Sequence, residues 1–503
     1  MLHRPYARVV RLVGIVMAAT TAATIMDGTA AAQESRPAGW PQFQGGPGHD
    51  GFRDDGPEPP YRVRWSVPDP SGDRLSPAIL VGDLAVTVGP EAVYGVDLAD
   101  GAIAWQIPRQ GGPLSAPAVG SAAGADVLVY LEGPAATSAG EPSPTASPTT
   151  DVTTPTSPGT AGDDDDAPVT ELVGVTLGDR TERWRVRLEA ISRTGVTIDG
   201  DTVYVGDQGG TLSAFSIADG TVRWSNTVTG RIDTPVAVAD GSVFVVARDS
   251  EGASVALVSF DAATGERSWP PFTVPASSTA GSAPSAADGR LFVGSADRVI
   301  RAVSTDDGTE AWASLVLSLF SPATAPALGD GSVFAADFGG GLYRLDVADG
   351  DRTWSHQLNE VILRGAPVVS GDAVLVGLSD GRLVAVDAGS GHLVWQRDLT
   401  EGSLGAIAIA DDVVIAVTGG PEAGLVALEN DPEGTLIDVP SPTEFDPRAT
   451  FALYAAAAAI VFVLAFVPGV YARRRFGSTI GSTDEAADAG DEGPGADDED
   501  VNA

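Results

Sequence analysis

The residues that could carry out catalysis are few and far apart. The four histidines are His3, His49, His356 and His392, and the 503-residue sequence contains no cysteine. Thiol nucleophiles, zinc–thiolate sites and disulfide bonds are therefore excluded. No GxSxG or HExxH motif stands in the strand–helix context that its chemistry requires, and the glycine-rich run at 339–341 is typical of a hairpin turn. We predict no catalytic residues.

Four successive aspartates at 163–166 resemble a calcium site only superficially. Calcium-binding loops alternate their oxygen ligands along a turning backbone, which a run of one residue type does not do. The run lies near the end of a stretch at 134–168 that is rich in Ser, Thr and Pro. Such a stretch cannot bury enough apolar surface to fold, so we predict a disordered acidic insert. We expect no metal-binding residues.

Acidic residues greatly outnumber basic ones. The chain carries 68 Asp and Glu against 30 basic residues, all of them Arg, and its formal net charge is −38. An acidic excess of this size argues against binding to nucleic acid or to an anionic membrane surface, because both would be repelled. We interpret the negative charge as a feature that keeps the protein soluble.

Tryptophans recur with a period near forty residues. Six of the seven spacings between them lie between 40 and 45 residues, and they stand at Trp65, Trp105, Trp184, Trp224, Trp269, Trp312, Trp354 and Trp395. A glycine precedes six of them by four residues: Gly101, Gly220, Gly265, Gly308, Gly350 and Gly391. A repeat of this length that contains short strands is typical of a β-propeller. We predict that the tryptophans dock neighbouring blades and that the glycines make turns.

The unit at 366–395 shows the repeat most clearly, with four short β-runs separated by Gly/Asp turns. The last unit, at 405–430, has three strands and no tryptophan, whereas residues 61–65 form a lone strand before the first unit. Joined, they complete a blade and leave no open sheet edge. We therefore predict an all-β domain at 61–430, an eight-bladed β-propeller closed by N- and C-terminal strands.

The repeat resembles the pyrroloquinoline-quinone-like (BamB-like) β-propeller repeat family. Residues 261–269 (DAATGERSW) and 387–395 (DAGSGHLVW) match its turn-and-tryptophan motif, and residues 40–52 resemble the lead-in that precedes many of these propellers. The resemblance covers roughly 40–430 and implies the propeller fold. The family includes quinoprotein dehydrogenases, the outer-membrane assembly lipoprotein BamB and anchored propellers of unassigned role.

For an enzyme, the resemblance implies pyrroloquinoline quinone and calcium at the mouth of the ring, often beneath a ring formed by two adjacent cysteines. This chain departs from that pattern, because it has no cysteine and its regular spacing leaves no room for long insertions between blades. It also lacks the cysteine that lipid attachment in BamB requires. We therefore expect no cofactor, and a divergent quinone-binding oxidoreductase stays as the alternative.

The N-terminal end has the pattern of an exported protein. Residues 1–32 combine a basic start, a short apolar run and an Ala-Ala-Ala cleavage site, which indicates a signal peptide. The Gly/Pro-rich lead-in at 33–60 is expected to lie across the ring.

The C-terminal end predicts a membrane anchor. A Pro-rich stalk at 431–450 precedes 22 uncharged residues at 451–472, enough for one transmembrane helix. Three arginines open the segment 473–503, whose remainder is an acidic tail. Arginines next to a span favour the cytoplasmic side, so we expect a single-pass protein of the cell membrane with the propeller outside and the tail in the cytoplasm.

Three functions are compatible with these features. The first is a binding or scaffolding module for envelope or extracellular proteins or peptides, because propellers present a rigid face of loops. The second is the quinone-dependent oxidoreductase. The third is a sensor that signals through the tail, which would need a cytosolic output domain that the sequence does not encode. In propeller topology the insert at 134–168 joins the second and third strands of blade 2, so it would emerge on the face of the inter-blade loops.

Overall fold

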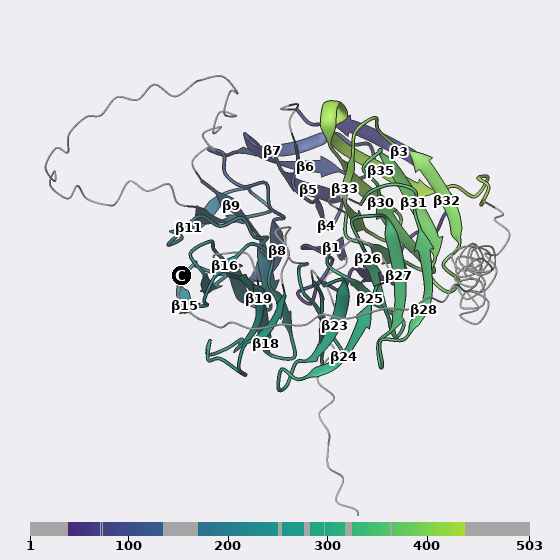
Figure 1. Ribbon diagram of the computed structural model, residues 1–503. Helices are drawn as coiled ribbons and strands as arrows, with labels where there is room; N and C mark the ends of the chain where they lie inside the picture. The colour runs from purple at the N-terminus through teal and green to yellow at the C-terminus, as the bar shows by residue number, and fades with distance from the viewer. Residues whose placement is uncertain are drawn as a thin grey trace, which may run out of the picture. The chain divides into compact units, whose positions relative to one another are not determined.

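The computed structural model describes residues 39–437, except 71, 73, 134–169, 250–253, 276–281, 296, 317–323 and 363–364. The described strands form eight sheets, and the regular elements include one short 3-10 helix, η2 (Gly420–Glu422). Figure 1 shows the sheets arranged around a common centre, with β1 and β4 near the middle. The predicted all-β, eight-bladed propeller is confirmed.

Blades 1 to 4 follow the order of the chain, from the inner strand to the outer strand. Blade 1 contains β1 (Gly39–Trp40), β4 (Ile79–Val81), β5 (Leu84–Val88), β6 (Ala92–Asp97) and β7 (Ile103–Pro108). Blade 2 contains β8 (Ala118–Ala122), β9 (Ala125–Glu132), β10 (Glu171–Thr176) and β11 (Glu182–Arg187). Blade 3 contains β12 (Thr197–Asp199), β13 (Thr202–Gly206), β14 (Thr211–Ser216) and β15 (Val222–Thr227). Blade 4 contains β16 (Arg231–Ile232), β17 (Ala237–Ala239), β18 (Ser242–Arg248), β19 (Ser254–Asp261) and β20 (Phe272–Pro275).

Blades 5 to 8 continue the ring, and the last two recruit strands from the N-terminal end. Blade 5 contains β21 (Ser285–Ala287), β22 (Arg290–Ser295), β23 (Val299–Ser304) and β24 (Glu310–Leu315). Blade 6 contains β25 (Ala327–Gly329), β26 (Ser332–Ala336), β27 (Gly341–Asp346) and β28 (Arg352–Gln357). Blade 7 contains β2 (Phe52–Arg53), β29 (Val368–Ser370), β30 (Ala373–Gly377), β31 (Arg382–Asp387) and β32 (Leu393–Asp398). Blade 8 contains β33 (Leu404–Ile409), β34 (Val414–Thr418), β35 (Gly424–Asn430) and β3 (Tyr61–Pro68).

The core lies between blades, and this explains the pattern of each strand. All five residues of β13, a second strand, are buried, because blades pack on both of its faces. In the outer strand β15, by contrast, only Trp224 is buried and four of the six residues are exposed. Between blades 2 and 3, for example, Val129 shares one apolar cluster with Val205 and Phe215. Each blade therefore needs its neighbours to bury its apolar residues.

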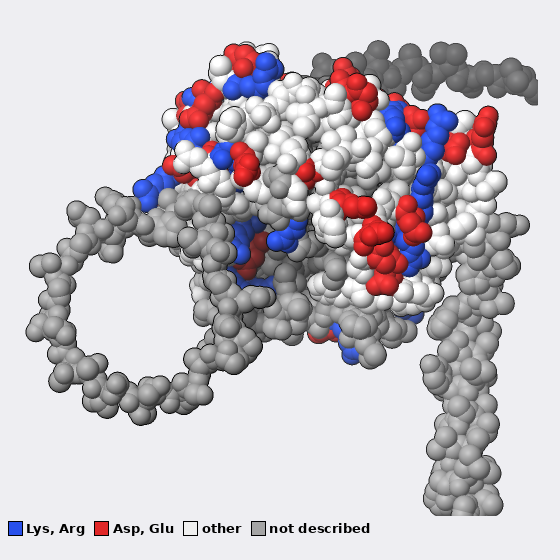
Figure 2. All heavy atoms as spheres, turned by 90° about the horizontal axis from the view of Figure 1, so that it is seen from above, with Lys and Arg blue, Asp and Glu red and all other residues white. Residues whose placement is uncertain are grey.

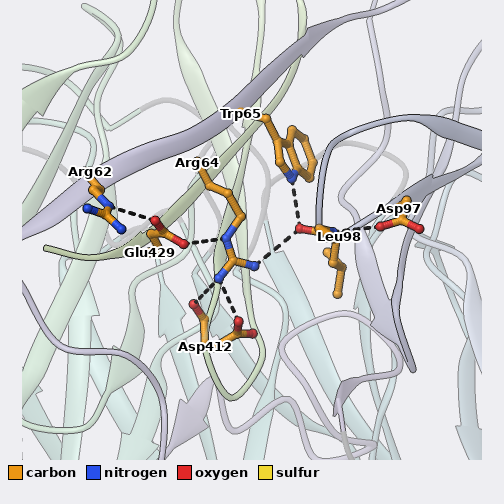
Figure 3. Close-up of polar contacts among 8 residues, drawn as sticks. Arg62, Arg64, Trp65, Asp97, Leu98, Asp412 and Glu429 are labelled. Atoms are coloured by element: carbon orange, nitrogen blue, oxygen red, sulfur yellow. Dashed lines mark hydrogen bonds and ion pairs between the residues drawn. The ribbon is translucent and has the colours of Figure 1, made fainter.

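The ring closes in blade 8, where β3 pairs antiparallel with β35. Arg62 and Arg64 each donate to one carboxylate oxygen of Glu429, both at 2.7 Å, and Arg64 also reaches Asp412 at 2.7 Å (Figure 3). The Trp65 indole N–H donates to the Leu98 carbonyl of blade 1 at 2.9 Å. The N-terminal strand is thus held on one side by the last blade and on the other by the first.

Several expected segments lie outside the described residues: the signal peptide at 1–32, the insert at 134–168, the span at 451–472 and the tail at 473–503. Within the described part of the chain, no helix has the length and apolar character to cross a bilayer. Of the expected stalk, residues 431–437 are described, and the Ile437 N–H donates to the Val394 carbonyl at 2.8 Å.

Candidate functional site

Most of the repeated tryptophans connect their own blade to the next one. Each indole N–H in the following list donates to a carbonyl oxygen of the next blade at 2.9–3.2 Å: Trp65 to Leu98, Trp184 to Ile217, Trp224 to Ala262, Trp269 to Thr305, Trp312 to Val347, and Trp354 to Ala388. Trp395 contacts the Tyr61 ring edge-on, with the ring centroids 5.1 Å apart. Trp105 packs against Gly95 of its own blade. Six of the eight indoles thus form a hydrogen bond that joins two neighbouring blades.

The repeated glycines complete this docking. Each has a left-handed φ between 70° and 77°, and a Cβ would come within 2.8 Å of the preceding blade: Gly101, Gly220, Gly265, Gly308, Gly350 and Gly391. At five of these positions the nearest atom is a carbon of the preceding blade's indole, and at Gly101 it is Val67. A side chain there would meet both backbone strain and a steric clash. Arg180 takes the same place in blade 2, with a φ of 61°.

The histidines do not form one site. His49 is fully buried near the centre of the ring, whereas His356 and His392 lie on neighbouring blades 6 and 7. Burial lowers the pKa of His356, and the nearby His392 lowers it further. His3 lies outside the described residues. Among the described residues, no three His, Cys, Asp or Glu side chains come together as a metal site.

The lead-in runs around the inside of the ring. Residues 39–53, called here the strap, meet the blades in numerical order, beginning with the pairing of Trp40 and Leu80 in blade 1. Inner-strand N–H groups then donate to strap carbonyls: Val119 to Pro41, Val238 to Pro47, Ala286 to Gly48, Leu328 to Asp50, and Val369 to Gly51. In blade 3, the Gln42 side chain accepts from the Ile198 N–H and donates to its carbonyl. The strap thus makes one circuit that contacts blades 1 to 7.

The strap fills the centre of the ring with its own side chains. Trp40, Gln42, Gln44 and His49 are at most 4% exposed. Phe43 packs against a cluster of small inner residues and contacts the His49 ring edge-on, with the centroids 5.1 Å apart. A planar cofactor at this level would have to displace the strap. The sequence resemblance at 40–52 identified this segment but not its path.

A groove lies between blades 2 and 3, on the outside of the ring. Its apolar lining includes Val186, Val205, Phe215 and Val222, and its polar lining includes Arg187, Glu189, Asp207, Thr211, Ser213 and Ser225. The Asp207 carboxylate accepts from the Thr211 N–H at 2.9 Å, and burial raises the pKa of Asp207. An apolar floor with a polar rim is suited to a side chain of a partner.

The groove exists because blade 3 carries two small residues at one step of its outer ladder. Ser213 and Ser225 are paired across strands β14 and β15, and their hydroxyl oxygens are 3.0 Å apart. At the same step, five other blades carry at least one long side chain: Tyr94, Arg185, Arg301, Tyr343 and Gln396. This difference was not predicted from the sequence, because Ser213 and Ser225 become neighbours only when β14 and β15 pair.

Charged side chains of both signs are mixed on one face of the molecule (Figure 2). Figure 2 shows acidic and basic side chains close together on the face that it presents, with broad uncharged areas between them. In blade 2, for example, Arg185 is bound by Glu132, Glu171 and Glu182 at 2.6–3.1 Å. Glu132 is nearly buried, whereas Glu171 and Glu182 are partly exposed, where ion pairs contribute little stability. All three pairs neutralise part of the acidic excess.

Comparisons with known proteins identify the repeat. Residues 170–283 and 276–430 match the family model described as "Outer membrane protein assembly factor BamB". The curated assembly factor BamB of Yersinia pestis is 30% identical over 243 residues, which are 46% of this chain and 60% of the relative. The chain therefore matches less than two thirds of that relative's length.

Solved structures share the fold at low sequence identity. BamB from Moraxella catarrhalis matches 74% of this chain and 100% of its own, with a TM-score of 0.52 and 16% identity. A quinohemoprotein alcohol dehydrogenase from Pseudomonas putida HK5 matches 81% of this chain and 82% of its own, with a TM-score of 0.57 and 12% identity. Likeness of fold alone does not choose between these functions. Because the family model matches residues 170–430, 261 of 503, the chain belongs to the pyrroloquinoline-quinone-like, BamB-like family of repeat propellers.

Proposed function

We propose that this protein is a membrane-anchored propeller outside the cytoplasm that binds protein or peptide partners and acts as a scaffold at the cell envelope. The observation that carries the proposal is the groove between blades 2 and 3, a preformed apolar hollow with a polar rim. The family supports it, since the relatives that the chain matches over 46% of its length are named as assembly factors. Assembly factors work by binding other proteins.

The groove provides the contacts that such a partner needs. Val222, which lines the groove, is 59% exposed, and Ile191, outside the lining in the loop that enters blade 3, is 36% exposed. Their burial by a partner would stabilise a complex by about 25 cal/mol per Å² of apolar surface. Glu189 and Asp207 add acceptors for an N–H or a basic side chain, so we expect an apolar residue flanked by a basic one in the partner.

The membrane attachment is part of the same proposal and depends on sequence. Residues 451–472 are uncharged and long enough for one span, and Arg473, Arg474 and Arg475 follow directly. We propose that this segment anchors the propeller on the outer side of the cell membrane, with the acidic tail inside. Accessibility of labels placed at either end of the segment in intact cells would test the orientation.

The test of partner binding uses a photo-crosslinking residue at Val222. We expect it to capture a specific envelope protein, and we expect Ser225→Trp, which fills the groove, to abolish that capture. Ser355→Trp in blade 6 is the matched control, because Tyr343 already occupies the same ladder step there. Equal capture in both variants would refute the groove as the binding site.

A quinone-dependent oxidoreductase is the competing proposal, supported by the fold that the chain shares with the alcohol dehydrogenase. We propose that no quinone binds, because the strap occupies the centre of the ring beside the inner strands. Titration with pyrroloquinoline quinone and calcium, followed by absorbance and thermal shift, decides between the two. Saturable binding with a rise in melting temperature would favour the enzyme.

A further inference from the structure

The inner strands present a circle of backbone donors that only the strap satisfies. The N–H groups of Val119, Val238, Ala286, Leu328 and Val369 donate to strap carbonyls at 2.6–2.9 Å. These residues are all at most 7% exposed. Buried N–H groups need a hydrogen-bond partner, and in this structure the strap carbonyls are that partner. The centre of the ring is therefore built to hold a polypeptide segment.

We propose that the centre of the ring is a peptide-binding site, which recognises one extended, glycine-containing segment through its carbonyl groups and which this chain fills with its own strap. The site is separate from the groove between blades 2 and 3, and it goes beyond the scaffold function. Recognition through the main chain resembles the way in which sheet edges bind extended peptides. The strap is the resident ligand, and another segment of the same chemistry can replace it once the strap is released.

Glycine is required at two close approaches between the strap and the blades. A Cβ on Gly39 would lie 2.4 Å from the Leu80 carbonyl oxygen, and a Cβ on Gly48 would lie 2.4 Å from that of Ala286. Side-chain recognition adds specificity, because the Gln42 amide makes two hydrogen bonds to Ile198, at 2.8 and 3.0 Å. The site therefore selects for backbone shape at some positions and for an amide at another.

Arg53 holds the strap closed. Its guanidinium donates to the Gly39 carbonyl at 3.2 Å, which joins the two ends of the strap. It also pairs with Asp55 and with Asp411 of blade 8. The Arg53 side chain is only 13% exposed. Its release would free both ends of the strap together, so Arg53 acts as the clasp.

A tethered strap competes strongly with any free peptide. The strap is joined to β3 through residues 54–60, and a short tether gives an effective concentration in the mM range. The unaltered chain is therefore expected to take up free peptide poorly. Weakening the strap without removing it should open the site.

The experiment measures uptake of a fluorescent peptide with the sequence of residues 39–56 by the full chain. Gly48→Ala and Arg53→Ala weaken the strap, whereas Gly46→Ala is the matched control, because a Cβ there meets only the Asp50 carboxylate, at 3.9 Å. We expect saturable binding to both weakened chains, at least tenfold tighter than to the control, with a rise in melting temperature. Folded Gly48→Ala and Arg53→Ala chains that bind no peptide would overturn the proposal.

A second measurement covers the case in which Gly48→Ala does not fold. Because the chain has no cysteine, Phe43→Cys introduces a single thiol in the strap. We expect the 39–56 peptide to accelerate alkylation of this thiol at least threefold in the Arg53→Ala background, and a scrambled peptide to have no effect. An alkylation rate that is independent of the peptide would refute displacement, and the groove proposal would be untouched by that result.

Discussion

His49 should make the stability of the ring depend on pH. The side chain is fully buried in the strap, with Nδ1 3.1 Å from the Pro284 carbonyl oxygen and the Phe43 ring against its own. Burial lowers the pKa of His49 from 6.5 to about 4, although the contact with the Pro284 carbonyl opposes this. The folded protein therefore keeps this imidazole neutral at a pH where the unfolded chain would protonate it.

The sign and size of the effect follow from linkage. Between pH 6.5 and 4 the unfolded chain binds the proton and the folded chain does not, so stability is fully present above pH 6.5 and falls as the pH drops. One pKa unit corresponds to about 1.4 kcal/mol. The free energy of unfolding should thus lose about 2 kcal/mol by pH 5 and about 3 kcal/mol by pH 4 through His49 alone.

The assay compares urea unfolding of the unaltered chain and of His49→Asn from pH 7.5 to 4.5. Asparagine tolerates the left-handed φ of 57° found at this position. The variant is expected to be less stable at pH 7 but to lose about 2 kcal/mol less on going to pH 5. Parallel curves for the unaltered chain and His49→Asn would refute the reasoning.

Three further predictions concern the closure and docking of blades. Arg64→Ala should cost about 1–3 kcal/mol of unfolding free energy in urea, because it breaks four charge-assisted hydrogen bonds of the closing strand, whereas Arg183→Ala on an exposed position should cost under about 0.5 kcal/mol. Trp224→Phe keeps a ring but loses the indole N–H bond to the next blade, so melting measurements should show a loss of about 1 kcal/mol. Gly220→Ala should destabilise the protein more than Gly200→Ala, since both have a positive φ but only Gly220 lies against an indole; equal losses would contradict the docking role.

The propeller could be predicted because its repeated residues make the same contacts in each blade. The tryptophan recurs in every blade, and in six blades a glycine stands four residues before it, since the indole must reach the next blade and the turn must leave room for the preceding indole. The eighth blade followed from a count of strands at the two ends, and β3 does pair with β35. Because the same contact is made in each blade, the residues that make it recur at a regular spacing, and one sequence is enough to reveal them.

The strap and the groove could not be predicted in the same way. The strap is not periodic, and its carbonyl groups accept from backbone N–H groups of five separate blades, so no residue type marks the contact. Its position inside the ring, where we expected it to lie across the ring, follows from donors that only the folded structure brings together. The groove depends on the small size of Ser213 and Ser225, since five other blades carry a long side chain at the same step. Such a difference becomes visible only when the strand register is known.

One turn contacts both the strap and the closing strand β3, so a change at this turn should weaken the attachment of both segments. In the turn between β33 and β34, Asp411 pairs with Arg53 of the strap, and Asp412 pairs with Arg64 of β3. Both carboxylates are more than 70% exposed, so salt should weaken both pairs. Asp411→Asn should therefore raise uptake of the strap peptide, and about 1 M salt should do so in the unaltered chain but add little in Asp411→Asn. If salt raised uptake equally in both chains, the clasp would have to lie elsewhere than at this turn.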